Sequence, residues 1–574
     1  MRLQKPFRSG LWPVATALAT VLALAVGLGT AEPAPRDQQQ DVRVKKVAKK
    51  PAAKAPHINQ QKTVSHPPGG PKRDGVNKER DATRHKGPEQ RKATNRTQDN
   101  RLNATRNGPA TRVDRGTRNR FVNATTPALR QVQRLNHHAA VLATRQRLPV
   151  HPLPGERNFT GVPPAGETRF VSTELVFQAG PNVTQQQIDD MARRHNCVAV
   201  ATQRSALTGG TLIRFRIAGT TGAADMVSAM EADGLGIAQP NYLYETFQQQ
   251  TSAAPAAAPD QYIIDKFKLA EVHKIATGKG VLVAIIDSQI DVKHPELVNS
   301  VADSFDAVGQ ADKPHAHGTG MLGAIVERSR LMGIAPDAKA LAIHAFSTGK
   351  QQSAQATTQS IIAGLEWALD KGARVVNMSF AGPYDPLLQV ALKKASERGA
   401  VLIAAVGNNG PTSPPLYPAA DPHVIGVTAT DQNDALFSNA NRGVYVAIAA
   451  PGVNILAPAP EGTYQLTTGT SVAAAHASGV AALLIERHPK VDAATILEVL
   501  TASATKAGAN GHDDGLGWGL IDPEAALAEL DARIADAEVA AKAPVATPTA
   551  PATQRPTPAP ARSALPRPGI YLPK

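Results

Sequence analysis

The chain has very little cysteine. Cys197 is the single cysteine among 574 residues, so no disulfide can form within the chain. Stability must therefore come from the packing of apolar side chains rather than from covalent cross-links. Cys197 lies in the run CVAVA, which is typical of a strand, and we therefore do not expect a nucleophilic thiol there.

Aromatic and acidic residues are scarce in the N-terminal quarter. Residues 32–160 contain 28 basic and 10 acidic residues, a net charge of +18, whereas residues 161–574 carry −7. The block shows no sustained helical or strand period and cannot bury enough apolar surface to offset chain entropy, so we expect it to be disordered. Its charge suits an anionic polymer or membrane surface. Nucleic acid is the less favoured partner, because interleaved aromatics that would stack on bases are missing.

The first 31 residues have the layout of a signal peptide. Arg2, Lys5 and Arg8 precede the apolar run LWPVATALATVLALAVGLGTA, which ends in small residues and predicts cleavage after Ala31. The run is nearly long enough to span a bilayer, so an uncleaved membrane anchor is the alternative. Both interpretations predict export, to the periplasm or the medium.

Residues 166–247 differ in character from the basic block. ETRFVSTELVFQ alternates like a strand, TQQQIDDMARRHN has a helical pattern, and CVAVATQRSALTGGTLIRFRI resembles two strands joined by a Gly-Gly turn. A second short helix, GAADMVSAMEADG, and a last strand, LGIAQPNYLYE, complete a small α+β module of the order β-α-β-β-α-β. Residues 248–258, QQQTSAAPAAA, have the composition of a linker.

Residues 259–535 have the pattern of an α/β domain. Continuous apolar runs alternate with helical stretches such as SIIAGLEWALDKG and PLLQVALKKASERG, which predicts a mostly parallel sheet with helices on both faces. The runs are VLVAIID, ALAIHAF, RVVNMSF, AVLIAAVG, HVIGVTA and YVAIAAPG. Residues 536–574 are rich in Pro and Ala, and we expect an unfolded tail there.

Three segments of this domain carry residues suited to nucleophilic catalysis. Asp287 ends an apolar strand, His317 precedes Gly-Thr at the start of a helix, and Ser471 opens a helix of small residues. A hydroxyl nucleophile needs a base to take its proton, and the base needs an acid to orient it. Asn408, after another strand, can form an oxyanion hole with the backbone N–H of Ser471.

Taken singly, each of these residues has a simpler explanation. An Asp that ends a strand is usually a turn residue, Ser often caps a helix, and Asn408 alone suits a turn. His315 competes with His317 for the role of base, and His476 suits helix packing. Only the joint occurrence of the motifs, in this order, favours catalysis.

Together the motifs resemble those of the subtilisin-like serine proteases, in the order Asp, His, Ser. The resemblance implies peptide-bond hydrolysis by Asp287, His317 and Ser471. It also implies a substrate strand bordered by Ser379, Phe380, Ala381, Gly382 and Gly407, and an inhibitory propeptide in residues 166–247. The matching segments are DSQID, HGTG, GTSVAAAH, GIAPDAK, VVNMSFAG, AAVGNNG and YPA.

Several positions depart from the family pattern. Gln289 and Ala381 stand where Gly is usual, Gly320 where a second His is common, and Ala475 where Pro usually follows the nucleophile. These departures put substrate preference and rate in doubt, and those at Gln289 and Ala475 support the alternative of a catalytically silent scaffold tethered by its basic arm. The segment ERSRLM is too short to resemble the family's calcium loop, so we expect no metal there and no cofactor elsewhere.

Overall fold

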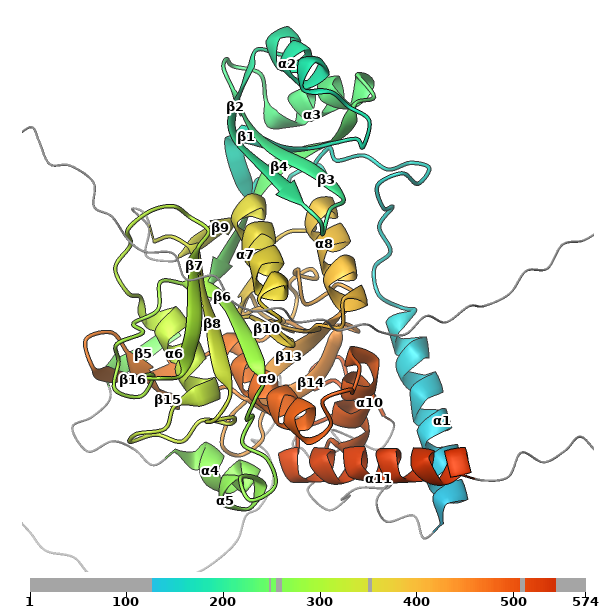
Figure 1. The fold of residues 1–574 in the computed structure, drawn as a ribbon, viewed down its shortest axis with the longest axis vertical. Coiled ribbons are helices and arrows are strands. Elements are labelled where there is room, and N and C mark those ends of the chain that lie inside the picture. Colours follow the sequence, from blue (N-terminus) through green and yellow to red (C-terminus); the bar gives the residue numbers. More distant parts are fainter. Residues whose placement is uncertain (1–125, 247–248, 254–260, 349–353, 506–510, 543–574) are drawn as a thin grey trace, which may run out of the picture. The chain divides into compact units, whose positions relative to one another are not determined.

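The computed structural model describes residues 126–246, 249–253, 261–348, 354–505 and 511–542 (Figure 1). The chain divides into two units, residues 1–97 and 98–574, and every described residue belongs to the second unit. The predicted signal peptide, most of the basic block and residues 543–574 lie outside the described residues.

A parallel sheet of seven strands confirms the predicted α/β domain. Every neighbouring pair is parallel. Six of the seven strands coincide with the apolar runs, because strands covered on both faces must be apolar throughout. The seventh, β7, has largely exposed side chains at one edge and lacks this signal. The strands follow the order β14 (Val446–Pro451), β13 (Val424–Thr430), β12 (Val401–Ala405), β10 (Val375–Met378), β6 (Leu282–Ser288), β8 (Lys339–Phe346) and β7 (Val301–Asp306).

Helices cover both faces of this sheet and enclose two hydrophobic cores. Helix α9 (Thr470–Arg487) is buried over almost its whole length, and its small residues let it lie directly against β10, β12 and β13. On the same face lie α4 (Tyr262–Phe267), α5 (Leu269–Val272), α6 (Ala316–Val326), α10 (Ala493–Ser503) and α11 (Pro523–Lys542), and on the other face lie α7 (Thr358–Asp370) and α8 (Pro386–Glu397).

The predicted β-α-β-β-α-β module is present as an antiparallel sheet with two helices. Leu175 and Phe177 of the first strand point toward the helices and pack with Met191 and Met230. The sheet has the order β4, β1, β3, β2. The elements are β1 (Phe170–Ala179), α2 (Gln185–Arg194), β2 (Cys197–Ser205), β3 (Gly210–Ile217), α3 (Ala223–Ala232) and β4 (Gly236–Thr246). Cys197 is buried, and burial raises the pKa of its thiol.

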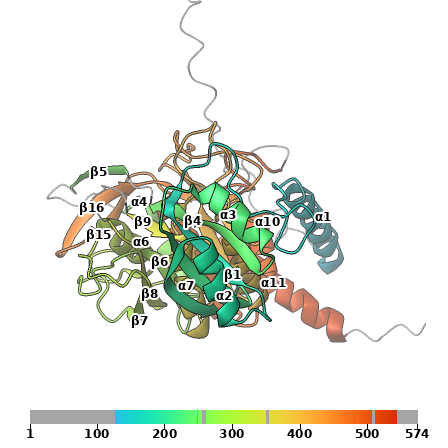
Figure 2. The ribbon, with the colours of Figure 1, turned by 90° about the horizontal axis from the view of Figure 1, so that it is seen from above.

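The other face of the module sheet packs on the α/β domain. Val176, Tyr242 and Tyr244 join the core that contains Ile361 and Leu365 of α7. The two-residue period of the strands thus places alternate side chains in two different cores. As Figure 1 shows, α2 and α3 cover one face of the sheet while α7 and α8 lie on the other side, and Figure 2 shows α2 and α3 from above.

The expectation of disorder throughout residues 32–160 is wrong for its last part. Residues 126–160 are described, and they contain helix α1 (Pro127–Arg145), which Thr126 caps through its side chain. The helix buries Val141 in a core of the α/β domain and contacts α10. Its stabilising partners lie hundreds of residues away, so no local pattern predicts it.

Two boundaries also require correction. Residues 249–253 of the predicted linker form strand β5 (Gln249–Ala253), which pairs with β16 (Thr463–Thr468) beside β15 (Ile455–Ala459). Helix α11 continues to Lys542 and so includes the first seven residues of the predicted tail. Strand β5 was not predicted because QQTSA shows no apolar alternation, and the strand forms through backbone pairing with β16. No helix in the described part of the chain is long and apolar enough to cross a membrane.

Candidate active site

The predicted catalytic residues lie at the carboxyl edge of the parallel sheet, where the strand order reverses. After β6 the chain forms β7 and β8 on one side of it. The later strands of this sheet, β10, β12, β13 and β14, lie on the other side of β6. Asp287 ends β6, and Ser379 follows β10 directly. Open α/β sheets bind ligands at this kind of reversal, because the connections diverge and leave a crevice.

Asp287 and His317 form a fully buried pair. His317 Nδ1 lies 2.7 Å from Asp287 Oδ1 and 2.9 Å from Oδ2, and neither side chain is exposed. The Asp287 carboxylate also accepts hydrogen bonds from the backbone N–H and the hydroxyl of Ser288, at 2.7 and 3.0 Å. Because a carboxylate accepts only, it places the imidazole proton on Nδ1 and leaves Nε2 as an acceptor.

His315 caps the start of helix α6 and is not the histidine that pairs with Asp287. Its Nδ1 accepts the backbone N–H of His317 at 3.2 Å and lies 3.3 Å from the Ser288 hydroxyl. Burial and the neighbouring His317 lower the pKa of His315. The structure therefore pairs His317, and not His315, with Asp287, as the HGTG motif indicates.

Gly318 lets α6 approach the end of β6. A Cβ at this position would lie 2.4 Å from the carbonyl oxygen of Ser288 and 3.1 Å from Asp287 Oδ1. The backbone N–H of Gly318 instead donates to the Ser288 hydroxyl at 3.1 Å. The glycine after His317 is therefore needed for the close packing that brings the imidazole to the carboxylate.

Ser471 lies in the first turn of α9 and is almost fully buried. Its carbonyl oxygen accepts the hydroxyl of Ser379 at 2.8 Å, and Asn377 of β10 donates to that same hydroxyl at 2.8 Å. Asn377 in turn accepts a hydrogen bond from the hydroxyl of Ser478, which lies about two turns after Ser471 along α9. This chain of bonds fixes the start of α9 against the end of β10, and sequence reasoning did not predict it.

No hydrogen bond joins the His317 imidazole Nε2 to Ser471 in this structure. Nε2 of His317 is buried and has no hydrogen-bond partner among the residues that the structure describes. Helices α6 and α9, which carry the two residues, pack directly on each other. Hydrogen bonds of catalytic groups are often long without substrate and shorten when it binds.

Asn408 is held in a defined orientation beside Ser471. Its Oδ1 accepts the backbone N–H of Thr470 at 3.0 Å and the Thr470 hydroxyl at 2.8 Å. The Nδ2 group of the amide is thereby turned away from Thr470. The Thr470 hydroxyl accepts the backbone N–H of Gly407 at 3.2 Å, and Gly407 has a φ of +102°, which favours glycine.

The predicted substrate-binding residues contact the module. Phe380 and Ala381 form strand β11 (Phe380–Ala381), which pairs antiparallel with Thr246 and Glu245 of β4. On the other side of β4 lies β9 (Gln355–Thr357), also antiparallel. The end of β4 is therefore a central strand between two edges of the α/β domain. Sequence reasoning missed β9, because QAT carries no strand pattern.

Gly382 and Asp385 complete this contact. A Cβ on Gly382 would lie 2.5 Å from the ring of Tyr244, so only glycine leaves room for this ring. Asp385 is buried and accepts hydrogen bonds from Gln239 and Thr358, each at 2.7 Å, while burial raises the pKa of the carboxyl. Gln239 also accepts the backbone N–H of Leu387 at 3.0 Å.

His476 packs inside the molecule, as predicted. Its Nδ1 lies 2.8 Å from the carbonyl oxygen of Pro451, and complete burial lowers the pKa of the ring to about 4. No group of three or more His, Cys, Asp or Glu side chains suited to a metal ion occurs among residues 126–542 where they are described. In the segment ERSRLM, the backbone N–H groups of Ser329, Arg330 and Leu331 donate hydrogen bonds to the carboxylate of Glu296.

Comparisons with known proteins agree with the fold. Residues 278–519 match the subtilase family. Subtilisin E of Bacillus subtilis (strain 168) is 35% identical over 278 residues, which cover 46% of this chain and 70% of that protein. The minor extracellular protease Epr of the same organism is 33% identical over 291 residues, 49% of this chain and 44% of Epr.

Among solved structures, the chain is similar to fervidolysin from Fervidobacterium pennivorans, described as a keratinolytic enzyme related to subtilisin. The TM-score is 0.55 at 24% identity, over 67% of this chain and 64% of fervidolysin, and this likeness concerns the fold. Family match, sequence identity and fold lead to one conclusion: the chain belongs to the subtilase family of serine endopeptidases.

Proposed function

We propose that the chain hydrolyses peptide bonds with Ser471 as nucleophile, His317 as base and Asp287 as orienting acid. The observation that carries this proposal is the buried pair in which Asp287 holds Nδ1 of His317 while Nε2 has no partner among the described residues. An imidazole in this tautomer can accept a hydroxyl proton, and the buried carboxylate stabilises the imidazolium that forms.

In the first step, the Ser471 oxygen bonds to the peptide carbonyl carbon while His317 Nε2 takes the hydroxyl proton. The amide nitrogen leaves with that proton as the C–N bond breaks, and water then repeats the sequence to release the acid. Asn408 and the Ser471 N–H stabilise the oxyanion. The orientation of the Asn408 amide, with its oxygen on Thr470, supports this role.

Substrates bind as an extended strand between β9 and β11. The pairing of β4 with both edges supports this, because an antiparallel ladder forms through backbone groups that every peptide possesses. Ser379, Phe380, Ala381 and Gly382 then border the substrate on one side, and Gly407 lies beside the oxyanion donor. Residues 166–247 act as an inhibitory propeptide whose last strand occupies the substrate position.

The enzyme matures by cutting its own chain after β4. Thr246 pairs with Phe380, and Gln249 pairs with Thr468, three residues before Ser471. The bonds between residues 246 and 249 therefore join a strand that pairs with β11 to a strand that pairs with β16, which ends three residues before Ser471. These bonds lie at and just before the start of the predicted linker, residues 248–258.

The test is the processing of Ser471→Ala. We expect the native chain to yield a fragment that begins at residue 247, 248 or 249, and Ser471→Ala to accumulate uncut. Ser438→Ala, at an exposed serine, is the matched control and should be cut like the native chain. Normal cutting of Ser471→Ala at the same bond would contradict self-processing.

Export is part of the same proposal. Residues 1–31 act as the signal peptide, and the basic residues 32–125 contact an anionic polymer or membrane surface outside the cytoplasm. Three basic residues before an apolar run support the signal peptide, and the net charge of +14 over residues 32–125, from 23 basic and 9 acidic residues, supports the anionic partner. N-terminal sequencing of the uncut Ser471→Ala chain tests the leader, since removal predicts a chain that begins at Glu32.

A further inference from the structure

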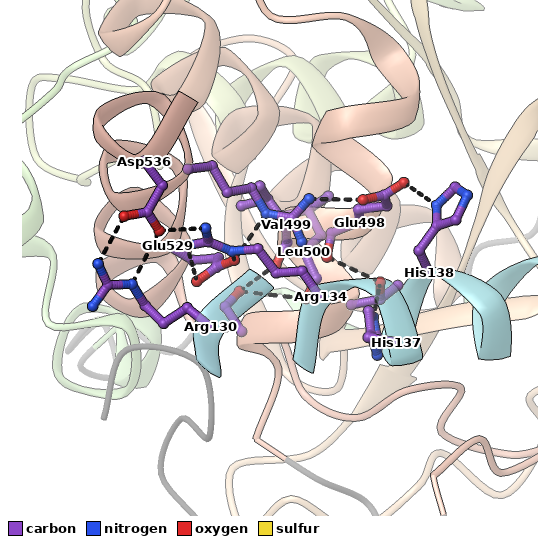
Figure 3. A network of polar contacts seen from close by, with 12 residues as sticks. Arg130, Arg134, His137, His138, Glu498, Val499, Leu500, Glu529 and Asp536 are labelled. Carbon is purple, nitrogen blue, oxygen red and sulfur yellow. Dashed lines mark hydrogen bonds and ion pairs between the residues drawn. The ribbon is translucent and has the colours of Figure 1, made fainter. Parts of the chain in front are cut away.

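Helix α1 is fixed to the α/β domain by a cluster of ion pairs remote in sequence from the catalytic residues (Figure 3). Arg134 donates to Glu529 at 2.9 Å and to Asp536 at 2.7 Å, and Arg130 donates to both oxygens of Asp536 at 3.0 and 2.8 Å. His138 lies 2.5 Å from Glu498. As Figure 3 shows, all of these α1 side chains point toward α10 and α11.

The ion pairs are partly withdrawn from water. The Glu529 side chain is fully buried, and that of Arg134 is 11% exposed. Loss of Arg134 would leave the buried charge of Glu529 with one cation fewer. Such a loss strongly destabilises the contact between α1 and α11. Arg533 of α11 also donates to Glu529 at 2.8 Å, which supplies the second cation of this site.

Apolar and aromatic contacts extend the same interface. His137 is buried, lies 2.9 Å from the Thr501 hydroxyl and packs its ring against Trp518 with the centroids 4.8 Å apart. Val141 joins the core that contains Leu497 and Leu500 of α10. The combination of a desolvated aromatic contact with buried ion pairs is typical of specific helix docking.

The charges of the two surfaces are complementary. Residues 127–145 include three arginines and no acidic residue, whereas α11 carries five acidic and two basic residues. Glu529 and Asp536 lie beyond residues 278–519, the part that matches the subtilase family. Helix α1 and its partners on α11 therefore lie outside the family match, whereas its partners on α10 and Trp518 lie inside it.

We propose that the surface of α10 and α11 is a docking site for helix α1 that retains the N-terminal segment after the chain is cut. This inference rests on the proposed function, in which the enzyme cuts its own chain after β4 and β4 inhibits it. The docking of α1 itself does not depend on which protease makes the cut. The N-terminal segment then contacts the enzyme twice, through β4 at the substrate strand and through α1 at α10 and α11. Its inhibition of the enzyme is bivalent.

The expected gain follows from linked binding. Residues 146–169 connect the two contacts within one chain, so that release of β4 leaves it tethered close to the substrate strand by α1. Linkage of two sites in this way raises overall affinity by about 10²–10⁴-fold over either site alone. The cut enzyme therefore remains inhibited until α1 dissociates or the segment is degraded.

The test uses the full chain with Ser471→Ala and a foreign protease site inserted between residues 246 and 249, so that β5 stays with the enzyme as in the proposed native cut. After cutting by the foreign protease, the dissociation rate of the N-terminal fragment is measured by exchange with labelled fragment. Arg134→Gln should raise this rate at least about tenfold, and the pair Arg130→Gln with Arg134→Gln should raise it further. Arg193→Gln, at an exposed arginine of α2, is the matched control and should leave it unchanged.

A double-mutant cycle shows that the effect crosses the interface. Arg130→Gln combined with Asp536→Asn should be little worse than Asp536→Asn alone, because Asp536→Asn already removes the contact with Arg130 as well as the contact with Arg134. Equal rates for Arg134→Gln and Arg193→Gln, or additive effects in the cycle, would overturn the proposal. Since the foreign protease makes the cut, these rates are measured whether or not the native enzyme cuts itself.

Discussion

The N-terminal region contacts the α/β domain in two chemically different ways. Strand β4 is held by backbone pairing with β9 and β11, whereas helix α1 is held by side chains, chiefly Arg130 and Arg134 on the carboxylates of α11. Backbone pairing is available to any extended peptide, so that site can accept many substrates in place of β4. The α1 contact depends on particular charges and is therefore specific to this chain.

This difference separates release from recognition. Under the proposed function, a substrate competes with β4 because it uses the same backbone groups, but it does not compete with α1, which is held by side chains.

The largest effect should come from Asp287→Asn. The amide can no longer hold His317 in the productive tautomer, so we expect kcat to fall about 10⁴-fold while both N-terminal contacts persist. Hydrolysis of an unstructured protein substrate measures this, after a foreign protease has cut the native and variant chains and the N-terminal fragment has been removed from both. Asp303→Asn, at an exposed aspartate of β7, should retain native activity. Native activity in Asp287→Asn would contradict the role of this acid.

The β4 contact should weaken when its buried side-chain bonds are lost. Gln239→Ala removes one donor to Asp385 and the acceptor of the Leu387 N–H, and leaves both groups less well satisfied in a buried site. We expect the inhibition constant of the N-terminal fragment to rise about 10–100-fold. Gln186→Ala on the exposed side of α2 is the control, and an equal rise in both variants would place the effect elsewhere.

Acid should weaken the α1 contact. Hydrogen bonds from Arg130, followed by those from Arg134, lower the pKa of Asp536 to about 2 from its ordinary value of 3.8. A lowered pKa favours the ionised, docked form, so this contribution is complete above about pH 4 and disappears as the pH falls toward 2. The fragment dissociation rate at pH 5, 3.5 and 2.5 tests this. Asp536→Asn should dissociate faster at pH 5 and show a flatter pH dependence, and parallel curves would contradict the assignment.

The smallest effect should concern Glu327, which has no cation partner among the described residues. Burial and then the charge of Glu296 raise the pKa of Glu327 well above 4.5. The folded state therefore favours the protonated form, and stability declines as the pH rises above about 4.5, where the unfolded carboxyl ionises. Glu327→Gln should lessen the decline in Tm between pH 5 and pH 8, by about 2–4 °C. An unchanged decline would contradict a protonated Glu327.

The sequence predicts those parts of the fold whose cause is local. Six strands of the parallel sheet follow from continuous apolar runs, and both module helices follow from their periodicity. Helix α1, by contrast, is stabilised by Asp536, about 400 positions along the chain, and no local pattern reveals such a partner. Strands β5 and β9 depend on backbone pairing alone and carry no side-chain signal.

The candidate site was predictable to a similar extent. The motif around His317 selects the histidine that pairs with Asp287, whereas His315 caps α6. The bond from Ser379 to the carbonyl of Ser471 was not predictable, because it requires the end of β10 and the start of α9 to be adjacent in space. Motifs identify reactive groups, but the residues that position them are known only from the structure.

Labelling with a fluorophosphonate tests the catalytic assignment most directly. The reagent is applied to the cut enzyme after removal of the N-terminal fragment, and the modified peptide is identified by mass spectrometry. The account predicts one modified residue, Ser471, with labelling lost in Ser471→Ala and strongly slowed in His317→Ala. A folded, fragment-free enzyme that is not labelled, or that is labelled at another serine, would contradict it.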